Sequence, residues 1–154
     1  TSGKLFRWSV IILVKIYLDN CCFNRPFDDQ TQIKIHLETQ ENYNSGKNKG
    51  GLYGLVWSYI LDYENGRNPY EEKRAISPWR KIASECISEE SEEILIFAES
   101  LSEKGIKTYD ALHLACAVSA NCDYYLTTDK KLINTPIPEI KILNPVIFVN
   151  EMEE

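Results

Sequence analysis

The chain has 154 residues, of which 17 are basic and 23 acidic, giving a formal net charge of −6, and 44% are hydrophobic. This size predicts a single domain with its own core, and the acidic balance argues against a protein that coats DNA through bulk positive charge. No apolar run in the sequence is longer than residues 10–14, which is far too short to cross a membrane. Five cysteines without a C-x-x-C pair, and no evident signal peptide, predict reduced thiols, no structural zinc and a cytoplasmic protein.

A mostly apolar and β-branched segment, residues 10–18, predicts the first strand of a sheet. Because the segment has no polar face, we expect helices on both sides of it, as in parallel sheets. A helix should follow, capped by Asp28 or Asp29. Residues 52–57 then predict a second strand, which leads into a helix from residue 58 to about 64.

The second half of the chain predicts more helix than strand. Ser77 and Pro78 are a favourable helix start, and Ser88 opens a further helix that Gly105 ends. Thr108 should cap the next helix. The remaining strands are expected at residues 124–127 and 140–143, with 146–149 continuing after Pro145. Strands that alternate with helices indicate an α/β domain with a mainly parallel sheet.

Four acids lie where these elements could bring them together. In an open α/β sheet, binding sites form beyond the carboxyl ends of the strands. Asp19 directly follows the first strand. Asp129 follows, and Asp123 precedes, a later strand, so those two should lie at opposite edges of the sheet. Asp110, in the first turn of its helix, and Glu64, about two turns along another, can face the same edge as Asp19.

Each acid alone has an ordinary explanation as a helix-terminus, turn or solvated residue. If the four acids lie close together, these explanations do not suffice, because two carboxylates about 5 Å apart repel by roughly 3 kcal/mol at an effective dielectric near 20. Four such groups require protons or a divalent cation, and an all-oxygen set of ligands favours Mg²⁺ or Mn²⁺ over zinc. If the acids converge, they therefore predict a metal site.

Three segments carry a resemblance to a known family. They read KIYLDNCCFNRPFDD at 15–29, LVWSYILDYENGRNP at 55–69 and TYDALHLACAVSANCDYYLTTDKKLI at 108–133. They resemble the acidic motifs of the PIN-domain family (PilT N-terminus type), most specifically where D-A-L-H-L-A precedes D-x-x-L-T-T-D. The resemblance covers about residues 14–150 and leaves residues 1–13 as an N-terminal extension.

The resemblance implies a three-layer α/β/α sandwich with a mainly parallel central sheet, and a Mg²⁺- or Mn²⁺-dependent endoribonuclease. Many small members are VapC-like toxins of toxin–antitoxin pairs, so the expected partners are an RNA substrate, an antitoxin protein and a second copy of the chain. Carried over residue by residue, the motifs place the catalytic and metal-binding acids at Asp19, Glu64, Asp110 and Asp129, with Thr127 and Asn20 as supporting polar residues.

Two residues close to these acids in the sequence, Asp62 and His113, could also belong to the site. Asp62 is two residues from Glu64, about 200° away around a helix, so only one of them can face the site. Glu64 fits better, since it directly precedes the Asn65-Gly66 helix stop. His113, one turn after Asp110, is more typical of a core or supporting residue than of a ligand.

Basic and thiol side chains also flank the acids. Lys130 and Lys131 follow Asp129, and we expect them to contact substrate phosphates. Cys21 and Cys22 follow Asp19 without an apparent base to activate a thiol, so they are expected to pack, with Cys22 the exposed one.

Two other function classes fit part of this pattern. A phosphotransfer receiver also gathers acids and a threonine at strand ends, but it needs a lysine that ends a later strand, and none is found here. A binding module that keeps the fold and only engages a partner protein is the other alternative, and the intact set of acids counts against it.

Overall fold

The computed structural model describes residues 13–23, 33, 52–67 and 69–152. Its five strands form one parallel sheet in the order β3-β2-β1-β4-β5. The strands are β1 (Leu13–Leu18), β2 (Leu52–Ser58), β3 (Glu85–Ile87), β4 (Tyr124–Leu126) and β5 (Lys141–Leu143). The described helices are α4 (Tyr59–Asn65), α5 (Tyr70–Ile82), α6 (Glu92–Glu103), α7 (Thr108–Ser119), α8 (Lys130–Ile133) and α9 (Pro145–Met152), with the 3-10 turn η1 (Asn20–Cys22).

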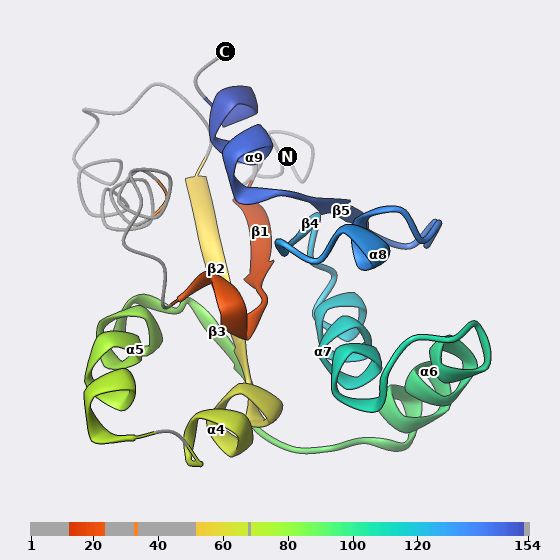
Figure 1. Ribbon diagram of the computed structural model, residues 1–154, viewed down its shortest axis with the longest axis horizontal. Helices are drawn as coiled ribbons and strands as arrows, with labels where there is room; N and C mark the ends of the chain where they lie inside the picture. Colours follow the sequence, from red (N-terminus) through yellow and green to blue (C-terminus); the bar gives the residue numbers. More distant parts are fainter. Residues whose placement is uncertain (1–12, 24–32, 34–51, 68, 153–154) are drawn as a thin grey trace, which may run out of the picture.

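The central strand β1 is buried on both faces, as its apolar sequence predicts. Tyr17 is fully buried on one of these faces. Its ring stacks on that of Tyr125 in β4, with centroids 5.4 Å apart and planes 8° apart. The ring of His113 in α7 lies over it, with its centroid 5.7 Å away. Helix α7 therefore covers this face of the sheet, and α6 packs beside α7 (Figure 1).

The opposite face of the sheet is covered by α9. Phe148 of α9 lies edge-on to Tyr53 of β2 and to Tyr124 of β4, with ring centroids 6.0 Å and 5.1 Å away. Helices on both faces of an all-parallel sheet confirm the predicted three-layer α/β/α sandwich (Figure 1). The expectation of strand structure at residues 146–149 is wrong, because Pro145 opens a helix there and the side-chain oxygen of Asn144 accepts a hydrogen bond from the Val146 backbone N–H at 2.8 Å.

Helix α5 begins earlier than the sequence predicts. Ser77 and Pro78 lie inside it rather than at its start, and Pro69 occupies the N-cap position. An internal proline costs a helix one backbone hydrogen bond. Burial of Ile76 and Trp79 opposes that cost, and the Trp79 ring packs edge-on to Phe23 at 5.5 Å. Tertiary packing thus overrides the local signal.

Helix α6 begins at Glu92, and its N-cap is Ser91 rather than Ser88, because the Ser91 hydroxyl accepts the Ile94 backbone N–H at 3.2 Å. The residues just before it form the edge strand β3, which the sequence analysis did not predict. Its three residues are only partly buried or exposed, so they lack an apolar alternation that would reveal a strand.

Some predictions lie outside the described residues. They concern residues 1–12 of the predicted extension 1–13, the start of the first strand and the helix cap at Asp28 or Asp29. Leu13, the last residue of that extension, begins β1, and Ile33 is helical and buried. Within the part of the chain that the structure describes, no helix is both long and apolar enough to cross a bilayer.

Candidate active site

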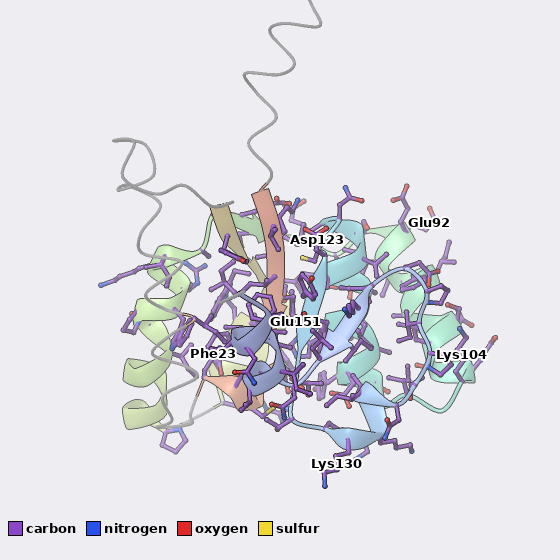
Figure 2. The ribbon with its side chains drawn as sticks, turned by 90° about the horizontal axis from the view of Figure 1, so that it is seen from above. Phe23, Glu92, Lys104, Asp123, Lys130 and Glu151 are labelled. Atoms are coloured by element: carbon purple, nitrogen blue, oxygen red, sulfur yellow. The ribbon has the colours of Figure 1, made fainter. Side chains whose placement is uncertain are left out.

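The carboxyl ends of β1 and β4 bring Asp19 and Asp129 to one edge of the sheet. Asp19 directly follows β1, and its backbone N–H donates to the carbonyl of Leu126, the last residue of β4, at 2.9 Å. Asp123 lies at the other end of β4, where its carboxylate accepts the Lys15 backbone N–H at 2.9 Å. Figure 2 shows Asp123 and Lys130, the neighbour of Asp129, at opposite ends of the molecule, as the sequence analysis expected.

The hydroxyl of Thr127 joins the two strand-end acids. It is fully buried, donates to Oδ2 of Asp19 at 2.8 Å and accepts the backbone N–H of Asp129 at 3.1 Å. Oδ1 of Asp19 accepts the backbone N–H of Asn20 at 2.7 Å. Thr127 thus supports the acids through its side chain, whereas Asn20 supports Asp19 through its backbone.

Glu64 is held by a buried chain of hydrogen bonds that reaches across the sheet. Its carboxylate contacts Nε2 of His113, a residue that is 1% exposed. Nδ1 of His113 lies 2.6 Å from the Tyr17 hydroxyl, which lies 2.6 Å from the hydroxyl of Ser58. Ser58 is also the N-cap of α4 and accepts the Leu61 backbone N–H at 3.3 Å. The network therefore ties both ends of α4 to β1 and α7.

One assignment of protons satisfies every group in this network. The Ser58 hydroxyl donates to Tyr17, Tyr17 donates to Nδ1 of His113, and Nε2–H of the neutral imidazole donates to Glu64. A fully satisfied buried network of this kind fixes side-chain positions. His113 is thus a buried supporting residue, as expected from the sequence.

The network gives a prediction about stability. Tyr17→Phe should lower the free energy of unfolding by about 1–3 kcal/mol, because it leaves buried Ser58 and His113 atoms without their partner. Tyr125→Phe is the matched control: this ring is equally buried, but its hydroxyl has no hydrogen-bond partner among the described residues. Its loss should be neutral or stabilising. Urea unfolding of both variants checks this, and equal losses would contradict the network.

The acids influence one another electrostatically. The pKa of Asp19 is raised to about 6, first by burial and then by the charge of Cys21, and the hydrogen bonds from Thr127 and the Asn20 backbone oppose the rise. The pKa of Asp110 is also raised, first by burial and then by the charge of Asp19, with Asp129 and Glu64 adding to it. All four predicted acids therefore contribute to one region of negative potential.

The four acids have the ligand chemistry that suits a hard divalent cation, but their side chains are not arranged as a complete coordination sphere. Within the described ranges, no three Asp, Glu, His or Cys side chains stand close enough together to hold an ion. Carboxylate oxygens are nevertheless the ligands that Mg²⁺ and Mn²⁺ prefer. Burial and the charges of the other acids raise the pKa of Asp110, which marks a cost that a cation would relieve. Asp110 has no hydrogen-bond partner among the described residues, so its side chain can rotate toward an ion, whereas Oδ1 of the exposed Asp129 caps α8 by accepting the Lys131 backbone N–H at 2.9 Å.

Asp62 does not belong to this group of acids. Its carboxylate accepts from Nε1 of Trp57 at 2.9 Å and from two guanidinium nitrogens of Arg80 at 2.9 and 3.1 Å. Burial acts to raise the pKa of Asp62, but the Arg80 and Trp57 hydrogen bonds outweigh it and hold the pKa below its usual value. The structure thus places Glu64, and not Asp62, toward Asp110.

The expectation for the cysteine pair is wrong in one respect, since Cys21 is exposed and Cys22 is buried. Sγ of Cys21 lies 3.3 Å from the Thr128 hydroxyl. Hydrogen bonds from Cys22 and then Thr128 outweigh burial and lower the pKa of Cys21 to about 5. None of the five cysteines forms a disulfide.

A small open pocket lies beside Asp110 and Asp129, and three lysines line it: Lys104, Lys107 and Lys131. Gly105, between the first two, has a φ of 94° and so lets the chain turn sharply from α6 toward α7. Lys131 was predicted as a phosphate contact, whereas Lys130 does not line this pocket. Lys104 and Lys107 were not predicted from the sequence, although two lysines in a short connection before an acid are a recognisable signal for a phosphate contact.

Comparison with known proteins bears on the fold. No family model and no curated protein matches the sequence significantly. Among solved structures, PAE2754 from Pyrobaculum aerophilum is similar over 92% of this chain and 98% of its own, at 14% identity and a TM-score of 0.50. VapBC-1 from nontypeable Haemophilus influenzae is similar over 86% of this chain and 99% of the matched chain, at 19% identity and a TM-score of 0.50. At these identities the likeness establishes the fold: the chain has the PIN-domain, VapC-like fold that its acidic motifs predict.

Proposed function

We propose that the protein is a metal-dependent ribonuclease whose acids hold Mg²⁺ or Mn²⁺ at the carboxyl edge of the sheet. The observation that carries the proposal is that Asp19 and Asp129, which follow β1 and β4, are both hydrogen-bonded to the buried Thr127 hydroxyl, while burial and the charges of Asp19, Asp129 and Glu64 raise the pKa of Asp110. Four acids from separate parts of the chain face one region, and no cation among the described side chains pairs with Asp19 or Asp110. Such an arrangement costs stability without a cation, so it suggests a function.

The residues have distinct roles in this proposal. Asp19, Asp110 and Asp129 would hold the cation, and Glu64 would act from its fixed position against His113. A bound Mg²⁺ or Mn²⁺ supplies a Lewis acid that activates water and balances charge on a phosphodiester. Lys104, Lys107 and Lys131 line the pocket next to two of the acids, where they attract the phosphates that an acidic site alone would repel.

The alternatives are less well supported. A phosphotransfer receiver needs a lysine at the end of a strand, but β4 ends at Leu126 and β5 at Leu143. A binding module without activity gives no reason for several acids to be gathered at one edge. A role as the toxin of a toxin–antitoxin pair, with an antitoxin or a second copy as partner, stays a narrower proposal that rests on the resemblance and on the likeness to VapBC-1.

Metal removal tests the proposal directly. Cleavage of single-stranded RNA by the purified protein should disappear in EDTA and return with excess Mn²⁺ or Mg²⁺. The nucleophile would be a water that the cation activates, not a side chain, so cleavage requires the cation. Ca²⁺ is a suitable control, since it binds oxygen ligands with a looser geometry. Full activity in chelator would refute metal dependence. Phosphorylation by a small phosphodonor, with no RNA cleavage, would favour the receiver instead.

A further inference from the structure

A cluster of exposed aromatic and cationic side chains lies beside the acids. Tyr63 of α4 is 54% exposed and Tyr109 of α7 is 39% exposed, and their ring centroids are 6.0 Å apart. The guanidinium carbon of Arg67 lies 5.6 Å from the Tyr63 ring centroid, and a guanidinium nitrogen donates to the Tyr109 hydroxyl at 3.5 Å. We call Tyr63, Arg67 and Tyr109 the aromatic platform.

The platform is contiguous with the proposed site. Tyr63 directly precedes Glu64 in α4, and Tyr109 directly precedes Asp110 in α7. Successive helix residues point about 100° apart, so each tyrosine lies on the helix face next to its acid. The platform therefore forms one rim of the acidic region. The lysine-lined pocket beside Asp110 provides a separate source of positive charge at the same site.

We propose that the aromatic platform stacks an unpaired base of the RNA substrate next to the bond that is cleaved, so that the substrate is single-stranded. This inference rests on the proposed ribonuclease function. Exposed aromatic faces together with an arginine are the means by which proteins bind single strands, because every base offers a π-face. A base in a duplex is already stacked on both sides and cannot use the platform.

The charge and place of the platform favour RNA over a protein partner. The planar cation of Arg67 lies over one ring and suits both a base and its phosphate. The other large exposed apolar side chains of the described residues are aliphatic and belong to other helices, Leu95 and Ile96 to α6 and Val146 and Ile147 to α9. A surface that only binds a protein partner gives no reason for the two tyrosine rings to lie next to Glu64 and Asp110.

Binding of a labelled single-stranded oligoribonucleotide, followed by fluorescence anisotropy, tests the platform. The parent protein carries Asp110→Asn, so that cleavage is slow on the timescale of the binding measurement while Mg²⁺ is present. Tyr63→Ala should weaken binding about tenfold, because base–aromatic stacking is lost, whereas Tyr63→Phe should bind within about twofold. Ile96→Ala, which removes an exposed apolar side chain on α6, should leave binding unchanged.

A second arm changes the RNA instead of the protein. A single abasic position placed along the strand should weaken binding about tenfold at one site, and Tyr63→Ala should then add little further loss. A duplex of the same sequence should bind more weakly and be insensitive to Tyr63→Ala. If Tyr63→Ala fails to fold, the abasic scan and Tyr63→Phe still decide the question.

The outcomes separate the two proposals. Unchanged binding by Tyr63→Ala, while the wild type cleaves RNA with metal, would overturn the platform, leave the ribonuclease standing and point to a protein partner for these rings. Equal binding of duplex and single strand would also overturn it. If the wild type neither binds nor cleaves any RNA, the ribonuclease proposal fails and the platform fails with it.

Discussion

Asp110→Asn should lower RNA cleavage by about 10²- to 10³-fold and yet leave the metal-free protein at least as stable as the wild type. The loss of activity is of the order seen when one preorganised group is removed from a catalytic site. The stability follows from electrostatics. Burial and the charges of three other acids raise the pKa of Asp110, so the folded state disfavours its negative charge, and the neutral asparagine removes that cost.

Thermal unfolding with and without Mg²⁺ checks both halves of this prediction. A ligand that binds only the folded state stabilises it, by about 2.7 kcal/mol at a hundred times its Kd, and Asp110→Asn should gain less than the wild type. Asp62→Asn is the control, since Asp62 is an acid of α4 that pairs with Trp57 and Arg80; it should cleave normally. A clear loss of apo stability in Asp110→Asn would instead identify this residue as a structural acid at the start of α7.

The two acids that flank β4 should behave in opposite ways. Asp129→Asn is expected to cost roughly 10²-fold or more in cleavage with little change in folding. Asp129 also caps α8, where its Oδ1 accepts the backbone N–H of Lys131 at 2.9 Å, but asparagine caps a helix about as well as aspartate. The substitution thus removes the charge and keeps the cap.

Asp123→Asn is the matched change at the amino edge of the sheet. It should alter stability by no more than about 1 kcal/mol, because the amide oxygen can still accept the Lys15 backbone N–H, and cleavage should remain near wild type. Steady-state cleavage and urea unfolding of the two variants, measured side by side, decide the matter. If Asp123→Asn is inactive and Asp129→Asn is active, the chemistry takes place at the amino edge of the sheet, and the assignment made here is wrong.

The features that could be predicted from the sequence are those that a local pattern of residues indicates without ambiguity. The apolar segment that ends at Asp19 predicts a strand buried on both faces, and the position of acids after strands predicts the functional edge of the sheet. Parallel strands place all of their carboxyl ends on one side, so Asp129 and Asp123 could be told apart from chain direction alone. These inferences needed no knowledge of distant contacts.

Features that depend on contacts between distant segments were missed or misplaced. The bond between Tyr17 and His113 joins residues 96 positions apart, and that between Tyr17 and Ser58 joins residues 41 apart. Helix α9 forms from a β-branched sequence because Asn144 caps it and Phe148 packs on the sheet. The reversed exposure of Cys21 and Cys22 likewise reflects the turn η1, which no spacing in the sequence indicates.

The support given to the acids separates three acids that are held in place from one that is adaptable. Both carboxylate oxygens of Asp19 accept hydrogen bonds, and Glu64 is held against His113. Asp129 is exposed but is held as the cap of α8, whereas Asp110 has no hydrogen-bond partner among the described residues. The side-chain conformational entropy lost when an ion enters would therefore come mainly from Asp110. Affinity for the ion would then depend on how far α7 restricts this rotamer, while Asp19 and Glu64 set where the ion lies.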